Sequence, residues 1–150
     1  MVPEPVEQPV RKVNCVGVPL AAITMDEAQQ LADSSIASRA PCLFSTGNAY
    51  TLVMAQSNER LMAHYHQADA VLPDGMIPVW LTKLLPRSVP DKLAGPVFFQ
   101  EFVRRAPARG HRIFLLGSSE AVLERERLLP APTLRPPEED DEEESSSDEE

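Results

Sequence analysis

Short apolar runs that end in a polar turn recur along this 150-residue chain, and each is followed by a segment with helical periodicity. The runs are CLFST at 42–46, AVLP at 70–73 and RIFLLG at 112–117. Runs of this length are typical of buried parallel strands, and strands that alternate with helices are typical of a largely parallel sheet with flanking helices. The sequence therefore predicts an α/β, Rossmann-like domain whose functional groups lie at the carboxyl ends of its strands.

The remaining elements are predicted from local signals. A β-branched run predicts a strand over residues 12–18 that ends at Pro19. Thr24 and Glu27 have the spacing of a capping box, which predicts a helix over 25–38. Further helices are expected from Leu52 towards Gln67 with a break near Asn58, over 77–85, over 97–105 and over 118–129.

The formal charge of −9 is concentrated at the end of the chain. Residues 138–150 hold ten of the 23 acidic residues and none of the 14 basic ones, which leaves 13 acidic and 14 basic residues over 1–137. The Pro-rich and acidic stretch 130–150 has no apolar face to bury, so we expect it to be disordered. Residues 1–10, with three prolines, are expected to form an extended leader. The folded domain is therefore predicted to span 11–129, and nothing in this charge pattern predicts a nucleic-acid partner.

Our expectations about the cellular compartment and about bound metals depend on motifs that the sequence lacks. Cys15 and Cys42 show neither a disulfide framework nor zinc-ligand spacing, so we expect reduced thiols. His64 and His66 lie two apart on a predicted helix and point to different faces, which makes a shared metal site unfavourable. The sequence has no signal peptide and no run of ~18 apolar residues. We therefore expect a cytoplasmic protein without a membrane span, a metal or a cofactor.

The common nucleotide and hydrolase motifs are also missing. All six glycines are isolated, so the chain contains neither a GxGxxG fingerprint nor a P-loop. It contains no GxSxG motif for a nucleophilic serine. These absences argue against an ordinary dinucleotide-dependent dehydrogenase, a P-loop NTPase and an α/β-hydrolase.

Three loops that follow predicted strands remain as candidates for function: STGN at 45–48, PDG at 73–75 and LLGSS at 115–119. In an open α/β sheet such loops converge on one crevice. Taken alone, Pro-Asp-Gly is ordinary turn chemistry. The amides of the third loop, at the start of a predicted helix, could hold a phosphate group.

Taken together and in this order, the segments resemble the WecG/TagA/CpsF glycosyltransferases. The matching text is STGNAYTLVMAQSNERLMAHYHQADAVLPDGMIPVWLTKLL at 45–85, DKLAGPVFF at 91–99 and GHRIFLLGSS at 110–119. The most specific part is Thr-x-Asn followed by an apolar strand that ends in Asp-Gly. The resemblance implies transfer of an N-acetylmannosamine-type or related sugar from a UDP donor to a lipid-linked glycan at the inner membrane face. It also implies inversion at the anomeric carbon without an obligatory metal, peripheral membrane association and synthesis of cell-surface polysaccharide or teichoic acid.

Carried over position by position, the resemblance assigns roles to particular residues. Asp74 matches the family's proposed catalytic base, and Thr46 and Asn48 match its strand-end polar pair. A carboxylate on the face opposite the departing UDP can accept the proton of the acceptor hydroxyl. Hydroxyl and amide groups can orient sugar hydroxyls or phosphate oxygens. The further substrate-binding candidates are Gly75, Lys92, Gly95, Gly117, Ser118 and Ser119.

The chain also departs from the family pattern. Lys92 and Gly95 fit a basic-x-x-Gly motif, but the acidic residue that usually follows two positions after the glycine is Val97 here. The family pattern expected after the LLG run is not recognisable, so we expect a chain truncated after about the N-terminal half of the family domain. This leaves an alternative: an incomplete fragment that binds a nucleotide sugar or a partner without catalysis. The resemblance does not decide the donor sugar, the acceptor or the oligomeric state.

Overall fold

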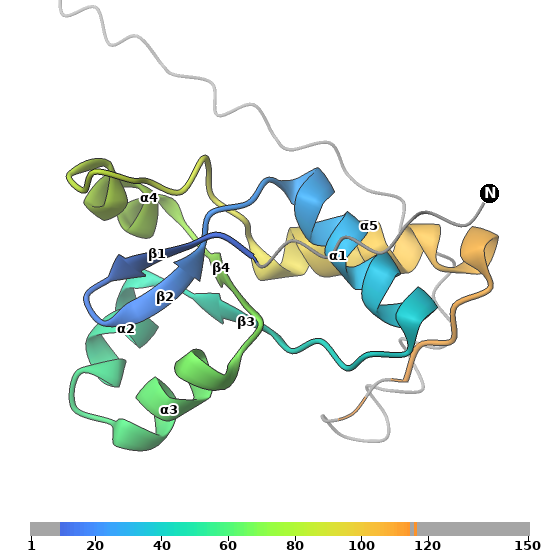
Figure 1. The fold of residues 1–150 in the computed structure, drawn as a ribbon, viewed down its shortest axis with the longest axis horizontal. Helices are drawn as coiled ribbons and strands as arrows, with labels where there is room; N and C mark the ends of the chain where they lie inside the picture. The colour runs from blue at the N-terminus through green and yellow to red at the C-terminus, as the bar shows by residue number, and fades with distance from the viewer. Residues whose placement is uncertain (1–9, 115, 117–150) are drawn as a thin grey trace, which may run out of the picture.

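The computed structural model describes residues 10–114 and residue 116, and these residues fold around a four-stranded mixed sheet (Figure 1). Across the sheet the strands are β1 (Lys12–Cys15), β2 (Val18–Ala21), β4 (Ala70–Pro73) and β3 (Phe44–Gly47). The β1–β2 pair is antiparallel, whereas β2–β4 and β4–β3 are parallel. The predicted α/β fold class with a largely parallel sheet is confirmed.

Five helices of the described region cover the two faces of this sheet (Figure 1). One face packs against α2 (Ala49–Ala55), α3 (Glu59–Gln67) and α4 (Met76–Lys83), and the other against α1 (Met25–Ser38) and α5 (Gly95–Arg105). The helices α1 and α5 lie side by side, and the side-chain amide of Gln29 donates a 3.0 Å hydrogen bond to the carbonyl oxygen of Phe98.

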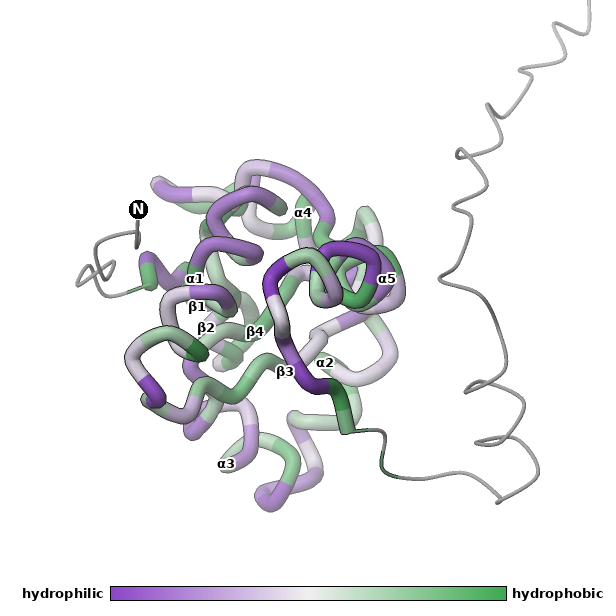
Figure 2. The backbone as a smooth tube through the Cα atoms, turned by 90° about the vertical axis from the view of Figure 1, so that its right-hand side faces the viewer, coloured by the Kyte–Doolittle hydropathy of each residue, from purple (hydrophilic) through white to green (hydrophobic). Residues whose placement is uncertain are grey.

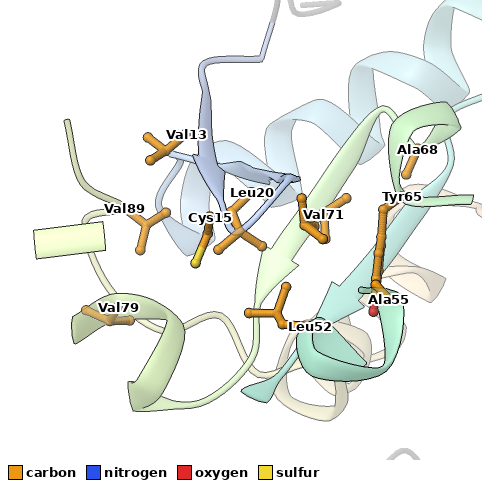
Figure 3. Packing of buried hydrophobic residues seen from close by; sticks show 11 residues of the cluster. Val13, Cys15, Leu20, Leu52, Ala55, Tyr65, Ala68, Val71, Val79 and Val89 are labelled. Carbon is orange, nitrogen blue, oxygen red and sulfur yellow. The ribbon is translucent and has the colours of Figure 1, made fainter. Parts of the chain in front are cut away.

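Strand β4 separates two hydrophobic clusters. Val71 packs with Leu20, Leu52 and Tyr65 on the side of α2 and α3 (Figure 3), while Leu72 packs on the side of α1. Successive side chains of a strand point to opposite faces, so a strand buried on both faces is apolar throughout. Figure 2 shows this as a green stretch along β4, in contrast to the largely purple tube of α1.

The helix boundaries agree with the local sequence signals. Thr24 caps α1, and Glu27 closes a capping box by accepting a 2.7 Å hydrogen bond from the Thr24 backbone N–H. That hydrogen bond is the main reason why the pKa of the Glu27 carboxyl lies below its usual value. The predicted break near Asn58 is confirmed, because Asn58 caps α3 after α2 has ended at Ala55.

The single strand predicted over residues 12–18 is wrong, because these residues enter a hairpin. Val16 and Gly17 form a two-residue turn with φ values of 46° and 88°, and Pro19 lies inside β2, opposite Asn14. The Ala22 N–H donates to the carbonyl of Arg11 at 2.7 Å, so Asn14 and Pro19 occupy a non-hydrogen-bonded pair. The missing N–H of Pro19 therefore costs no hydrogen bond to β1.

The strand predicted over 112–117 is also wrong for the residues that the structure describes. Residues 112–114 and 116 belong to no strand, and Phe114 and Leu116 are 85% and 92% exposed. Within the described part of the chain, the outer edge of β3 has no ladder partner. A strand exists only where its backbone groups have such a partner, and an apolar run alone does not supply one.

The physical reason lies in the segment that precedes this run. A 3₁₀ turn at Pro107–Arg109 is followed by Gly110 in the left-handed region, and the His111 N–H donates to the Ala106 carbonyl at 3.0 Å. The ring of His111 stacks on Phe102, with centroids 6.0 Å apart. These contacts keep the chain at the end of α5, away from the edge of β3.

Asp33 of α1 forms ion pairs with arginines at and just beyond the C-terminal end of α5. Its carboxylate accepts a hydrogen bond from Arg109 and one of 3.4 Å from Arg105, and it lies 3.5 Å from Nε2 of His111. The carboxylate is only 13% exposed. Two arginines on one shielded carboxylate join α1 to the C-terminal end of α5 more firmly than an exposed ion pair would.

Several predictions lie outside the described residues. They are the leader before Val10, the helix over 118–129 and the acidic stretch 130–150. In the part of the chain that the structure does describe, no helix has the length and apolar character needed to cross a membrane.

Candidate functional site

The loops that follow β3 and β4 lie directly against each other. The backbone N–H of Asp74, the first residue after β4, donates a 3.0 Å hydrogen bond to the carbonyl of Gly47 at the end of β3. Carboxyl ends of parallel strands meet at one edge of a sheet, which is where α/β proteins bind their ligands. The structure therefore brings the STGN and PDG loops together, as the sequence predicts.

Gly47 allows the end of β3 to pack closely on the sheet core, a role that local sequence signals do not predict. A Cβ atom at this position would lie 3.2 Å from Leu20 Cδ2 and 3.3 Å from Val71 Cγ1. A larger residue would have to push the sheet core aside. The sequence shows only a glycine between Thr46 and Asn48 at the end of an apolar run.

A third segment, residues 91–95, joins the same edge. The Leu93 N–H donates a 2.7 Å hydrogen bond to the carbonyl of Pro73, the last residue of β4. Gly95, the first residue of α5, lies so close to Thr46 that a Cβ atom there would be 2.5 Å from Thr46 Cγ2. The resemblance alone assigns Lys92 and Gly95 to donor binding, and these contacts bring their segment to the same edge as the loops after β3 and β4.

Helices α2, α4 and α5 begin at this edge, at Ala49, Met76 and Gly95. Backbone N–H groups in a first helical turn lack helical partners, and the N-terminus carries a partial positive charge. Gly75 precedes α4 with φ at 92°, a conformation that favours glycine, and nothing lies within 4 Å of where its Cβ would be. The edge thus offers amide donors and open space for a negatively charged ligand.

Thr46 and Asp74 are the two side chains that the resemblance places in catalysis. Thr46 is exposed, and its backbone carbonyl accepts a 3.1 Å hydrogen bond from the hydroxyl of buried Tyr65. Asp74 is half-buried on the adjacent loop. The hydrogen bond from Tyr65 therefore fixes the end of β3 that carries Thr46. The Asp74 side chain is partly exposed to solvent.

Asn48 has a structural role that the sequence analysis did not include. Its side-chain Oδ1 accepts a 3.0 Å hydrogen bond from the Thr51 N–H, and the Thr51 hydroxyl accepts one from the Asn48 N–H. This reciprocal pair caps the first turn of α2. The cap occupies Oδ1, so ligand contact through the side chain would use the Nδ2 amide.

We expect Asn48→Ala to lower the free energy of unfolding by about 0.5–2 kcal/mol, because the cap of α2 is lost. Asn48→Asp keeps the capping oxygen, so it should leave stability near that of the parent while weakening the binding of an anionic ligand. Urea unfolding measures the first effect and calorimetry with UDP the second. If the alanine variant is as stable as the parent, the cap makes no contribution.

Of the remaining predicted site residues, Lys92 lies in the part of the chain that the structure describes. Lys92 is exposed next to Leu93, and its N–H donates to the Asp91 carboxylate at 2.7 Å. Val97, at the position where the resemblance leads us to expect an acidic residue, is 43% exposed in the first turn of α5. The third predicted loop, with Gly117, Ser118 and Ser119, lies outside the described residues.

The two cysteines and His64 lie outside the loops that follow β3 and β4. Burial raises the pKa of Cys15, and burial together with the charge of Asp69 raises the pKa of Cys42, which makes both thiols poor nucleophiles at neutral pH. His64 Nε2 lies 3.1 Å from the Ser45 hydroxyl, which agrees with a packing role. Residues 10–114 and 116 contain no cluster of three or more His, Cys, Asp or Glu residues that could hold a metal ion.

Comparison with known families gives a match over most of the chain. The model of the glycosyl transferase WecG/TagA/CpsF family matches residues 13–128, which include every candidate residue discussed above. The comparison with curated proteins found no match.

Proposed function

The chain belongs to the WecG/TagA/CpsF family of glycosyltransferases, and we propose that it transfers an N-acetylmannosamine-type or related hexose from a UDP donor to a lipid-linked acceptor. The product would serve the synthesis of cell-surface polysaccharide or teichoic acid at the inner face of the membrane. Family membership makes the protein a transferase that uses a sugar donor and a glycan acceptor. The donor, the acceptor and the mechanism below are our proposal.

The observation that carries this proposal is the joining of three segments at one edge of the sheet. The Asp74–Gly47 and Leu93–Pro73 hydrogen bonds and the Gly95–Thr46 contact join the segments that carry Asp74, Thr46 and the N-terminus of α5, which supports the proposal. These are the groups that a sugar transfer from a nucleotide diphosphate needs: a proton acceptor, a polar group that orients the sugar, and donors for phosphate oxygens.

In the proposed reaction, the acceptor hydroxyl attacks the anomeric carbon from the face opposite the UDP. A C–O bond forms between the acceptor oxygen and that carbon, the bond to the diphosphate oxygen breaks, and the proton of the hydroxyl passes to the Asp74 carboxylate. UDP leaves with the electron pair of the broken bond, and the configuration at the anomeric carbon inverts.

The charge that develops on the leaving diphosphate needs donors on the other side of the sugar. We assign this stabilisation to Lys92 and to the N–H groups at the start of α5, with the backbone of Gly75 and the Gly117–Ser119 loop as further contacts. Preorganised donors of this kind favour the transition state because they need no reorientation as charge develops. Thr46 and Asn48 orient the sugar hydroxyls.

Titration of the full chain with UDP and with UDP-N-acetylmannosamine tests donor recognition without the acceptor. We expect saturable heat and a rise in the melting temperature, because a ligand at about 100 times its Kd stabilises the folded state by about 2.7 kcal/mol. ADP provides the matched control for the nucleobase. If neither uridine ligand produces heat or a thermal shift at millimolar concentration, the donor assignment is wrong.

The second candidate function is donor binding without transfer. Val97 favours it, because an apolar side chain stands on α5 where the family pattern has an acid. Under this alternative the full chain binds UDP-sugar as above but yields no product with a lipid-linked acceptor. Measuring transfer by the parent chain distinguishes the two functions, because only a catalytic chain forms product. If donor binding without transfer is correct, product can appear only in the Val97→Asp variant, which introduces the acid.

A further inference from the structure

A cation-lined cavity opens between the start of β1 and the loop that follows α4. Its volume is about 520 Å³, and its lining consists of Arg11, Lys12, Val13, Ala22, Arg87 and Ser88. The three charged residues of this lining are all basic, and all three are exposed. Charges of one sign on low-dielectric walls concentrate the electrostatic potential inside a hollow. The cavity therefore favours a negatively charged occupant.

The fold fixes the two sides of this cavity relative to each other. Val13 of β1 and Val89, which is next to the cavity lining, belong to the same buried cluster (Figure 3). The Val89 N–H also donates a 3.3 Å hydrogen bond to the hydroxyl of buried Thr82 on α4. The core therefore holds the backbones that carry Arg11 and Arg87, while their side chains reach solvent.

The described part of the chain offers little negative charge to the three cations. Arg11 lies 3.5 Å from Glu27, and the two side chains of this pair are 74% and 45% exposed. An ion pair in such exposed surroundings contributes little to stability. Lys12 donates a 3.0 Å hydrogen bond to the uncharged carbonyl of Ala68. None of the ion pairs of the described region involves Lys12 or Arg87.

The chain itself contains a segment of the opposite charge. Residues 138–150 hold ten acidic side chains, no basic one and no apolar one. Such a segment cannot fold by burying apolar surface, but an electrostatic contact with a basic surface does not require it to fold. The contact would also relieve the repulsion among the carboxylates of the segment. Charge therefore matches this segment to the cavity.

The length of chain between the segment and the described domain is sufficient for the contact. Residues 117–137 connect Leu116, the last described residue, to the acidic segment. A chain of about 20 residues spans up to about 70 Å when extended, whereas a domain of about 100 residues has a radius of gyration of about 13 Å. A tether of this kind keeps the local concentration of the segment in the millimolar range, so weak individual contacts are enough.

We propose that the cavity at Arg11, Lys12 and Arg87 binds the acidic segment 138–150 of the same chain. Guanidinium groups bind carboxylates through paired N–H donors, so the two arginines hold the segment, and Lys12 adds a point charge. The bound segment shields the cavity from other anions. None of the lining residues belongs to the candidate site, so the proposal does not depend on the proposed reaction.

The contact can be measured by cross-linking, because the chain has only three lysines: Lys12, Lys83 and Lys92. A carbodiimide joins a carboxylate to an amine in direct contact, with loss of water, and peptide mass spectrometry locates the new amide bond. In the full chain at about 0.1 M salt, we expect residues 138–150 to cross-link to Lys12 at least about fivefold more than to Lys92. At about 1 M salt the Debye length falls from about 10 Å to about 3 Å, so cross-linking to Lys12 should fall by about fivefold.

Substitutions of exposed arginines test the cavity itself. Arg11→Gln combined with Arg87→Gln should lower cross-linking between the segment and Lys12 by about tenfold, because two of the three cations are removed. The matched control is Arg60→Gln combined with Arg104→Gln, which removes two exposed arginines that do not line the cavity. The control should cross-link like the parent. Circular dichroism verifies that both variants keep the fold.

A second readout uses inorganic diphosphate as a probe of the shielded cavity. In a full-length variant, the ten acidic residues of 138–150 are replaced by the corresponding amides. Diphosphate should raise the melting temperature of this variant at least about twice as much as that of the parent, because the segment no longer competes for the cavity. Adding Arg11→Gln and Arg87→Gln should abolish this difference, since the two changes act on one contact.

The proposal is wrong if the segment cross-links equally to Lys12 and Lys92, or if the arginine substitutions at the cavity have no more effect than the control. An equal thermal shift with diphosphate in the parent and in the amide variant would show that the segment does not shield the cavity. Mixing isotopically labelled and unlabelled chains tests the route of the contact. Cross-links found only between chains would assign the segment to a second copy and would overturn the intramolecular contact.

Discussion

Asp74→Asn should lower the turnover of sugar transfer by about 10²–10⁴-fold, the loss typical when a general base is removed. The amide is nearly isosteric with the carboxylate but cannot take up the acceptor proton. Because the backbone N–H of Asp74 makes the hydrogen bond to Gly47, the side-chain change leaves the joined loops intact. Binding of UDP-sugar should therefore remain near that of the parent. Initial rates at saturating donor and calorimetric titration measure the two quantities.

Glu59→Gln provides the matched control for this experiment, since it removes one exposed carboxylate from the first turn of α3. It should transfer sugar at the parent rate. Equal turnover in the Asp74→Asn variant and the parent would contradict the assignment of the base. Loss of UDP-sugar binding in Asp74→Asn would instead show that the carboxylate acts in binding.

Gly95→Ala is expected to destabilise the fold by about 1–3 kcal/mol, the usual cost of overpacking. The new methyl group would lie 2.5 Å from Thr46 Cγ2, so the Thr46 side chain, α5 or the end of β3 must move. The backbone of Gly95 does not have a positive φ, so the cost comes from the contact and not from the glycine conformation. Equilibrium unfolding in urea measures the change.

A second substitution tests whether this contact is the cause. Thr46→Ser removes Cγ2 and keeps the hydroxyl, after which the nearest Thr46 atoms lie 3.7 Å or more from the added Cβ. The double variant Gly95→Ala with Thr46→Ser should therefore recover most of the lost stability, with a favourable coupling energy in the double-mutant cycle. Additive effects of the two substitutions would mean that the close approach does not limit packing at the site.

The elements predicted correctly from sequence depend on local chemistry. The capping residues Thr24 and Asn58 determine where their helices begin through contacts with residues three positions away. The apolar run 42–46 overlaps strand β3, and the run 70–73 coincides with strand β4. The hairpin was missed because its turn is Val16-Gly17, which lacks the Asn-Gly or Asp-Gly signal of such turns. The strand predicted over 112–117 is wrong at residues 112–114 and 116, which the structure describes, because pairing depends on a partner that local periodicity does not reveal.

The candidate site also combines features that the sequence predicts with contacts that it does not predict. The sequence predicts that the loops after β3 and β4 meet, because parallel strands end at a common edge. It does not predict that Leu93 bonds to Pro73 or that Gly95 lies against Thr46, since both contacts join segments far apart in the chain. The capping role of Asn48 was visible in its spacing to Thr51, but the threonine at the third helical position is a less common partner than glutamate or glutamine.

Helix α5 is attached at both of its ends, and this limits how its length can vary. Its first residue lies against Thr46, and Arg105, its last, binds Asp33 of α1. One inserted or deleted residue would shift one end by about 1.5 Å and rotate it by about 100° relative to the other. Insertions and deletions inside Gly95–Arg105 would therefore break either the contact with Thr46 at the candidate site or the junction with α1, so length changes in this part of the chain should be confined to the loop before Leu93.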